Sequence, residues 1–80
     1  MAGEAEKNVM TASRLREYMR ELETLRSVDR KEVTDRLRVA RSLGDLSQNR
    51  EYDEAKREQA RIENRIGELE EILRRAMTED

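Results

Sequence analysis

Asp45 and Gln48 are the residues of this chain whose types and spacing suggest chemistry, because they lie three positions apart in a polar turn. The turn, Gly44–Asn49, is the only convincing break in an otherwise helical sequence. A carboxylate there offers an oxygen ligand to Mg²⁺, which needs few protein ligands because it keeps several waters. The same spacing also fits a structural role, in which Asp45 caps the next helix and Gln48 reaches back to it. On spacing alone the structural role is favoured, and Asn49 is a second candidate for the cap.

The composition excludes most other chemistry. The chain has no Cys and no His, which rules out disulfides, thiolate nucleophiles, Ser-His-Asp catalysis and Cys/His zinc sites. Its 17 basic and 19 acidic residues give a net charge of −2 and are well mixed along the chain. This charge is not typical of a protein that coats nucleic acid, and the chain has no acidic tail. No apolar run approaches the roughly 18 residues needed to cross a membrane, and Met1–Glu4 begins no secretion signal. We therefore expect a cytoplasmic protein without a membrane partner.

The elements that position the turn must be long helices that share a narrow seam. Charged residues make up 45% of the 80 residues, hydrophobic residues 35% and aromatic residues 2%, which is too little large apolar surface for a thick globular core. A two-helix seam needs only about two apolar positions in seven. Disorder is the competing interpretation of so charged a chain, and the regular apolar spacing argues against it.

The second half of the chain carries the more regular helical pattern. One face follows an alternating 3-4 spacing over about four heptads, through Tyr52, Ala55, Gln59, Ile62, Ile66, Leu69, Leu73 and Ala76. The other faces are charged, and we expect most of those charges to be solvated. Because the chain has no Pro, this helix can run unbroken.

The first half is also helical, with Thr11 or Ser13 as its cap, and its seam is interrupted once. The two blocks of the seam are Leu15, Tyr18 or Met19, Leu22 and Leu25, and then Val33, Leu37, Ala40 and Leu43. Between the blocks, Leu25, Asp29 and Val33 are spaced 4-4, as in a stutter that locally unwinds a supercoil. A kink at this place is the alternative. We favour a continuous helix, because no Pro intervenes.

A short turn between two such helices makes them antiparallel. Gly44 is placed to end the first helix, since a helix C-terminus favours a residue with positive φ. A fold-back centred near Ser47 pairs residues whose numbers sum to about 95, which sets Ala40 against Ala55 and Leu25 against Leu69. At 1.5 Å per residue, a first helix of some 30 residues gives a rod of roughly 45 Å.

The predicted fold class is all-α, with two long helices forming an antiparallel coiled-coil hairpin. Residues 11–77 form this domain with its tip loop at 44–49, after a flexible N-terminus at 1–10 and before a tail at 78–80. The polar turn is thus expected at the tip of a projecting rod.

Residues 38–56 read RVARSLGDLSQNREYDEAK. This stretch resembles the tip of the bacterial transcript-cleavage factors GreA and GreB, whose pattern there is close to A-R-x-x-G-D-L-x-E-N-x-E-Y-x-x-A-[KR]. The likeness continues into residues 22–33 and 58–70 and covers nearly all of residues 10–76. It is specific, because an eight-position loop motif and both flanking helices match in register.

The resemblance implies a function that is completed by another molecule. In that family the coiled coil is inserted through the secondary channel of bacterial RNA polymerase, and two acids at its tip help to hold the second catalytic Mg²⁺. The active site of the polymerase then cleaves the 3′ end of backtracked RNA, so the factor is an accessory protein and not an enzyme. We expect this chain to act as a monomer, to share Mg²⁺ with the polymerase and to bind none stably alone.

The resemblance also assigns roles to individual residues of the tip. Asp45 matches the first tip acid and is the candidate metal ligand, whereas the second tip acid falls at Gln48. Lys56 falls at a basic position associated with RNA contact, and Arg57 extends that basic strip. The other matching positions are Gly44, Leu46, Asn49 and Tyr52.

Gln48 is the departure from the family pattern with the largest consequence. An amide oxygen is a weaker Mg²⁺ ligand than a carboxylate and cannot act as a base at neutral pH. The resemblance therefore implies channel binding with weakened or lost stimulation of cleavage. The alternatives are a non-cleaving competitor in the same channel and a generic coiled-coil interaction module. A stand-alone nuclease is disfavoured, because no cluster of acids or His could hold two metal ions without another molecule. The family's C-terminal globular domain is absent from this sequence, so we expect weaker affinity than with both domains.

Overall fold

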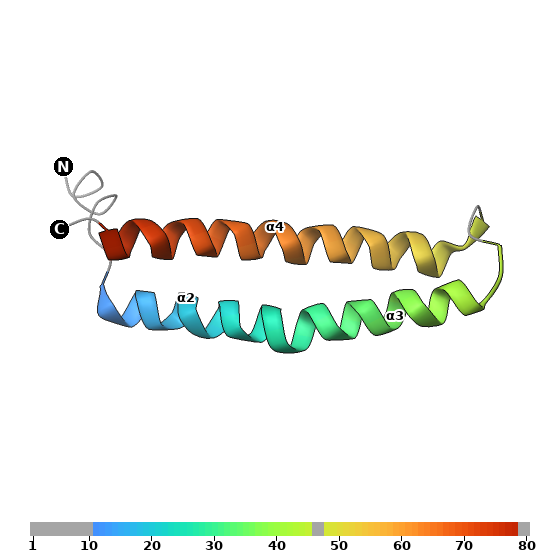
Figure 1. Ribbon diagram of the computed structural model, residues 1–80, viewed down its shortest axis with the longest axis horizontal. Helices are drawn as coiled ribbons and strands as arrows, with labels where there is room; N and C mark the ends of the chain where they lie inside the picture. The colour runs from blue at the N-terminus through green and yellow to red at the C-terminus, as the bar shows by residue number, and fades with distance from the viewer. Residues whose placement is uncertain (1–10, 46–47, 79–80) are drawn as a thin grey trace.

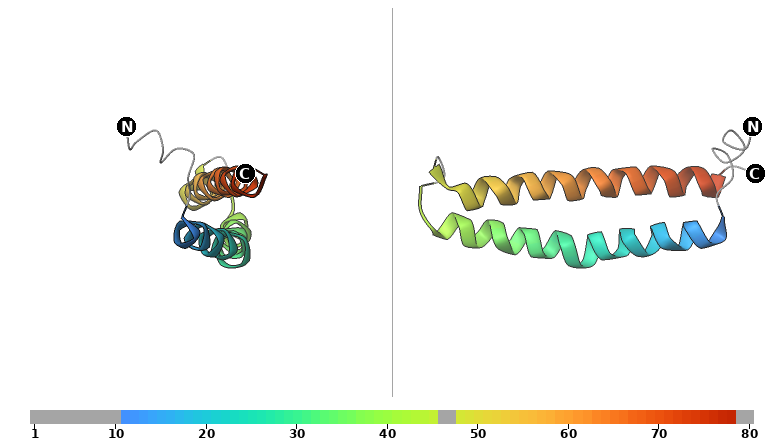
Figure 2. Two further views of the ribbon diagram at one scale, coloured as in Figure 1. Left: turned by 90° about the vertical axis from the view of Figure 1, so that its left-hand side faces the viewer. Right: turned by 180° about the vertical axis from the view of Figure 1, so that it is seen from behind.

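Two long antiparallel arms make up the molecule in the computed structural model, which describes residues 11–45 and 48–78 (Figure 1). The first arm consists of α2 (Ala12–Thr24), the π-helical turn η1 (Leu25–Asp29) and α3 (Arg30–Ser42), and the second arm is α4 (Arg50–Thr78). The arms lie side by side in each view of Figure 2, and the molecule measures 55 × 24 × 17 Å. The predicted all-α hairpin is confirmed.

The parts of the chain that the structure describes include the whole hairpin except the centre of its tip. The predicted flexible N-terminus at 1–10 and most of the predicted tail at 78–80 lie outside the described residues. Within the described ranges, no helix is long and apolar enough to cross a membrane.

Thr11 is the N-cap of the first arm. Its Oγ1 accepts a hydrogen bond from the backbone N–H of Arg14 at 3.0 Å, and its backbone is extended, with φ −68° and ψ 153°. This is the bond that satisfies an open N–H group at a helix start. Of the two predicted caps Thr11 is therefore correct, because Ser13 already lies inside α2.

The seam between the arms is the core of the molecule, and it is narrow. Its buried hydrophobic residues come from both arms and all hold predicted seam positions: Leu22, Leu25, Val33, Leu37, Ala40, Ala55, Ile62, Ile66 and Leu69. The prediction that Leu43 extends the seam is wrong, since 63% of its surface is exposed. Leu43 is the C-cap of α3, with φ −83° and ψ −4°, so the helical seam ends one turn earlier, at Ala40.

The interruption in the first-arm seam is the π-helical turn η1. The backbone N–H of Arg30 donates to the carbonyl of Leu25, five residues back, where an α-helix would bond residues four apart. The backbone stays helical on both sides, with φ −63° and ψ −42° at Thr24 and φ −67° and ψ −42° at Asp29. The predicted continuous helix is confirmed. The 4-4 spacing of Leu25, Asp29 and Val33, interpreted as a stutter, corresponds to this single π turn.

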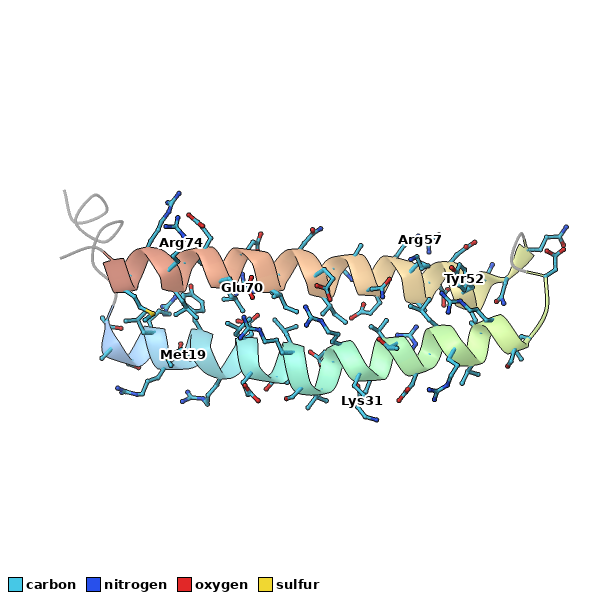
Figure 3. All side chains as sticks on the ribbon, viewed as in Figure 1. Met19, Lys31, Tyr52, Arg57, Glu70 and Arg74 are labelled. Atoms are coloured by element: carbon cyan, nitrogen blue, oxygen red, sulfur yellow. The ribbon has the colours of Figure 1, made fainter. Side chains whose placement is uncertain are left out.

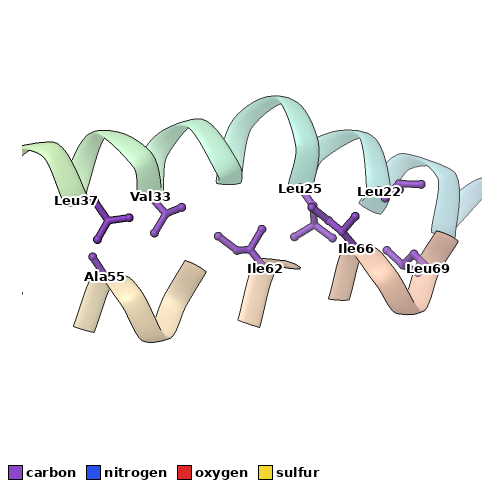
Figure 4. Close-up of a cluster of buried hydrophobic side chains, with 8 residues drawn as sticks. All are labelled: Leu22, Leu25, Val33, Leu37, Ala55, Ile62, Ile66 and Leu69. Carbon is purple, nitrogen blue, oxygen red and sulfur yellow. The ribbon is translucent and has the colours of Figure 1, made fainter. Parts of the chain in front are cut away.

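This π turn keeps both ends of the seam aligned with α4. Figure 4 shows Leu22 near Leu69 and Leu37 near Ala55, within one cluster of buried side chains. Leu37 follows Leu22 by fifteen residues, whereas Leu69 follows Ala55 by fourteen. The additional residue of the first arm is absorbed in η1, because a π turn holds about one residue more than an α turn.

The predicted register between the arms is wrong by about one helical turn. The pairs in Figure 4 have residue numbers that sum to 91 and 92, so Ala55 lies near Leu37 and not against Ala40. The cause is the position of the fold-back: α3 ends at Ser42 and α4 begins at Arg50, so the hairpin is centred near residue 46, before the predicted centre at Ser47. Apolar residues still meet across the seam, because a shift of one turn preserves the facing sides of both helices.

Candidate functional site

Gly44 ends the first arm in the predicted left-handed conformation. Its φ is +119°, a value that Gly adopts without steric cost. The backbone N–H groups of Leu43 and Gly44 donate to the carbonyls of Ala40 and Arg41, at 3.1 and 3.5 Å. These bonds satisfy carbonyls that the end of a helix leaves open, so α3 stops where the tip begins.

Asn49 caps α4 and joins it to the first arm. Its Oδ1 accepts a hydrogen bond from the backbone N–H of Tyr52 at 3.0 Å, as expected of an N-cap. Its Nδ2 donates to the carbonyl of Ala40 at 2.5 Å, and only 8% of the residue is exposed. Asn49 is therefore the cap, and the prediction that Asp45 caps the second helix is wrong.

Asp45 and Gln48 lie exposed at the same end of the rod. The backbone N–H of Gln48 donates to the carbonyl of Asp45 at 3.4 Å, which closes a turn between the two residues. Both residues are exposed, so the tip has a carboxylate and a neutral amide on its surface. Leu46, the other predicted tip residue, lies outside the described residues.

The described residues of the tip offer two oxygen donors but no complete metal site. Among the described residues, no three His, Cys, Asp or Glu side chains form a group that could hold a metal ion. Asp45 offers a carboxylate oxygen and Gln48 an amide oxygen, so the remaining ligands of an ion would be waters or groups of another molecule. This donor set fits an ion that is shared with a partner.

A basic strip, formed by Arg41, Tyr52 and Lys56, runs along one flank of the hairpin next to the tip. The Arg41 guanidinium lies over the Tyr52 ring, with Cζ 5.8 Å from the ring centre, a cation–π contact between the two arms. Tyr52 is half-buried and packs against the core. Lys56 lies one turn further along α4, and its Nζ donates to Oε1 of Gln59 at 3.2 Å.

Of the predicted RNA-contact residues Lys56 and Arg57, only Lys56 lies on the flank that carries Arg41 and Tyr52. Arg41 is not among the predicted contact residues, although the A-R pair of the tip motif includes its position. Its role depends on Tyr52, which belongs to the other arm. Arg57 is exposed but turned by about 100° from Lys56, and it lies on the side of α4 away from α3 (Figure 3).

Ion pairs join the arms in the half of the rod away from the tip. We call residues 12–30 and 62–78 the stem, and residues 31–45 and 48–61 the tip half. The pairs across the stem are Glu21–Arg65, Arg26–Glu70 and Arg30–Glu63. Arg65 and Arg30 each donate two hydrogen bonds to one carboxylate, at 2.7 to 3.0 Å. The charged side chains of these pairs remain 39–50% exposed, as expected of charges in contact with solvent, but they also contact the opposite arm.

These contacts favour the charged form of the stem carboxylates. Hydrogen bonds from Arg65 lower the pKa of Glu21, and hydrogen bonds from Arg30 lower the pKa of Glu63. The pairs are close to half exposed, so each contributes little alone. Their positions before, within and after η1 hold the π turn against α4.

Comparison with known proteins assigns the chain to a family. The hairpin, with its polar motif at one end, defines an elongated coiled-coil domain. The family described as "Transcription elongation factor, N-terminal", that of GreA and GreB, matches residues 8–77. The chain belongs to this family of N-terminal transcription elongation factor domains.

Several curated relatives are similar over almost the whole chain. The transcription elongation factor GreA of Clostridium botulinum (strain Hall) is 52% identical over 77 residues, which are 96% of this chain and 48% of the relative. The GreA proteins of Clostridium novyi and Alkaliphilus oremlandii are 51% and 50% identical over 72 residues, 90% of this chain and 45% of each relative. The chain thus spans about half the length of the curated relatives it matches. No solved structure matches it.

Proposed function

We propose that this domain inserts its tip through the secondary channel of bacterial RNA polymerase and modulates the cleavage of backtracked RNA. The observation that carries the proposal is the gathering of the motif residues at one end of a thin rod: Gly44, Asp45, Gln48, Asn49 and Tyr52. A rod of 55 × 24 × 17 Å suits a narrow channel. Membership of the GreA and GreB family supports the same role.

Reaching a distant active site requires a rod that keeps its shape. The seam runs from Leu22 to Ala40 on the first arm and from Ala55 to Leu69 on the second. Ion pairs support the stem, and Asn49 closes the tip end. The contacts that hold the arms together thus extend over most of the length of the rod.

Asp45 is the residue that would hold the shared Mg²⁺. When bound, the ion offsets negative charge that develops on the phosphate during RNA cleavage. Asp45 offers one carboxylate oxygen from an exposed position, whereas the Gln48 amide is a weaker and neutral ligand that cannot take a proton from water. The domain is accordingly an accessory factor that occupies the channel and stimulates cleavage weakly.

The basic strip provides the contact with the 3′ end of the RNA. Arg41 and Lys56 place two positive charges beside the tip, and phosphate groups attract such charges without regard to sequence. The Tyr52 ring keeps the Arg41 guanidinium close to α4. The strip therefore lies where RNA approaching Asp45 would pass.

A non-cleaving competitor of Gre factors is the second candidate function. The observation that favours it is Gln48 itself, which removes an acid from a tip whose cap, glycine and basic strip are intact. Such a protein would exclude Gre factors from the channel without supporting hydrolysis.

A transcript-cleavage assay on stalled RNA polymerase tests the proposal. The wild-type domain should displace a full-length Gre factor and give weak Mg²⁺-dependent shortening of the RNA. Asp45→Asn should remove this cleavage without weakening displacement. The matched control is Asp53→Asn, because Asp53 is an exposed acid in the first turn of α4, outside the tip loop. Neither displacement nor cleavage by the wild-type domain would refute the proposed function.

A further inference from the structure

Each of the two Tyr residues of the chain carries an Arg guanidinium from the opposite arm. In the tip half, Cζ of Arg41 lies 5.8 Å from the centre of the Tyr52 ring, near the tip (Figure 3). In the stem, Cζ of Arg65 lies 5.9 Å from the centre of the Tyr18 ring. Both rings are half-buried and pack against the hydrophobic core. The two contacts therefore have the same geometry and lie in opposite halves of the rod.

The two guanidinium groups differ in their charge partners. Arg65 donates hydrogen bonds to Glu21 at 2.7 and 3.0 Å and to Glu68 at 3.1 Å, so two carboxylates offset its charge. Within residues 11–45 and 48–78, no ion pair joins Arg41 to a carboxylate, and Arg41 is exposed. The positive charge of Arg41 is therefore available to an anion of another molecule.

The backbone on both sides of the tip contact is fixed by the Asn49 side chain. Its Nδ2 donates to the carbonyl of Ala40, the residue before Arg41, and its Oδ1 accepts from the backbone N–H of Tyr52. The Tyr52 ring is held by its packing against the core, whereas an exposed Arg side chain loses much rotamer freedom when it is ordered. The ring thus gives the guanidinium a fixed surface to rest on.

We propose that Tyr52 is a positioning residue for RNA, whose ring holds the Arg41 guanidinium where it binds a phosphate of the extruded 3′ segment. The inference rests on the proposed function, because it assumes that backtracked RNA passes the basic strip. A guanidinium carries five N–H donors at its edges and binds phosphate through two of them, so a ring against its face leaves those donors available. A side chain that is held before binding loses less freedom on binding.

The aromatic character of Tyr52 is what this role requires. An aliphatic side chain could fill the same seam position, as Ile62 and Leu69 do further along α4. It would lack the negative face of an aromatic ring, which attracts a cation. Replacement of Tyr52 by an aliphatic residue and by another aromatic residue therefore separates filling of the seam from attraction of Arg41.

The test compares the affinity of the domain for bacterial RNA polymerase stalled with backtracked RNA and for the same polymerase with RNA that is not backtracked. Tyr52→Leu should bind the backtracked complex about two- to fivefold more weakly, the effect of one exposed cation–π contact. Its affinity for the other complex should equal that of the wild type, because the extruded RNA is missing there. Tyr52→Phe keeps the ring and should retain both wild-type affinities.

Tyr18→Leu is the matched control, because it removes the corresponding ring from the stem, where carboxylates offset the Arg65 charge. It should leave both affinities unchanged. Arg41→Ala should weaken binding to the backtracked complex at least as much as Tyr52→Leu, and the two changes together should cost no more than Arg41→Ala alone, since the ring acts through Arg41. Circular dichroism at the assay temperature checks that each variant is folded, and Tyr52→Met replaces Tyr52→Leu if the latter unfolds.

The other outcomes separate failure of the inference from failure of the proposed function. A wild-type domain that does not bind the polymerase refutes both. Equal wild-type affinity for the two complexes refutes the RNA contact, and with it the role of Tyr52, but leaves insertion into the channel. If the wild type prefers the backtracked complex and Tyr52→Leu keeps that preference, the inference alone is wrong. It is also wrong if Tyr52→Leu weakens binding to both complexes equally, or weakens the Arg41→Ala variant further, because the ring then acts without Arg41.

Discussion

The stem and the tip half hold their arms together by different means. In the stem, large aliphatic side chains meet across the seam and ion pairs join the arms on their surface. In the tip half, the seam narrows beyond Leu37 to Ala40 and Ala55. The arms are joined there by the Asn49 side chain and by the contact of Arg41 with Tyr52.

Under the proposed function, this comparison separates the residues that stabilise the rod from the residues that contact its partners. The stem provides most of the buried aliphatic surface, and burial of such surface is the main stabilising contribution to folding. The tip half leaves its charged, aromatic and apolar groups accessible beside the narrow seam. Substitutions should therefore divide into those that unfold the rod and those that change what it binds.

Truncation of the stem core should have the largest effect on stability. None of the surface of Leu69 is exposed, so Leu69→Ala should lower the free energy of unfolding by about 2–5 kcal/mol. That is a large part of the stability expected of a single two-helix seam. Thermal unfolding followed by circular dichroism measures it.

Leu43→Ala is the control in the tip half, because it removes the same atoms from a side chain that is 63% exposed. It should change the free energy of unfolding by no more than about 0.5 kcal/mol. Equal losses from the two substitutions would show that the stem and the tip half do not differ in this way.

Loss of the polar link at the tip should have an intermediate effect. Asn49→Ala removes both the cap of α4 and the hydrogen bond to the Ala40 carbonyl, at a cost of about 1–3 kcal/mol. Hydrogen exchange should quicken at the Tyr52 amide and change little in the stem. Asn64→Ala, an exposed position of α4 in the stem, is the control, and faster exchange there instead would contradict the role of Asn49.

Acid should weaken the stem more than the tip half. Hydrogen bonds from Arg65 and Arg30 lower the pKa of Glu21 and Glu63 below the ordinary value of 4.5. A carboxyl group with a lowered folded-state pKa stabilises the fold above its unfolded pKa, and this contribution is lost as pH falls through the folded value. The melting temperature should thus be flat near neutral pH and decline below about pH 4.5.

A variant at the stem identifies the groups behind that decline. Glu63→Gln removes one of the titrating carboxylates and should make the melting temperature less dependent on pH. Glu54→Gln, an exposed acid of the tip half, should leave the dependence as it is. If the two variants behave alike, the stem ion pairs are not the cause.

Deletion of one residue from η1 should have the smallest effect. Without Val28, which is 44% exposed, the turn can close as an ordinary α turn, so the free energy of unfolding should stay within about 1 kcal/mol of the wild type. Deletion of Arg36 from α3 is the control, because it rotates the rest of the seam by about 100°. Chemical denaturation compares the two deletions, and equal costs would show that η1 holds no extra residue.

Residue spacing was sufficient to predict the hairpin and its seam. A helix that buries one narrow face must repeat its apolar residues every three to four positions, and the buried hydrophobic residues all hold predicted positions. Gly44 was predictable because few other residues tolerate its positive φ. Leu43 was misplaced because spacing does not tell where a helix ends.

The features that depend on contacts between the two arms could not be predicted from the sequence. A 4-4 spacing is compatible with a stutter, a kink or a π turn, and packing against α4 decides among them. The register depends on the ends of α3 and α4, and the ion pairs of the stem depend on that register. At the site, Asn49 and Arg41 gain their roles from groups on the opposite arm, the Ala40 carbonyl and the Tyr52 ring.

The central claim is that a stable stem carries a tip that has every residue needed for cleavage except the second acid, at position 48. Transcript cleavage by the Gln48→Glu variant tests this claim most directly. The account predicts stronger Mg²⁺-dependent cleavage by the variant than by the wild type, with equal affinity of both for RNA polymerase. Strong cleavage by the wild-type domain, abolished by Asp45→Ala but unchanged by Gln48→Ala, would contradict it.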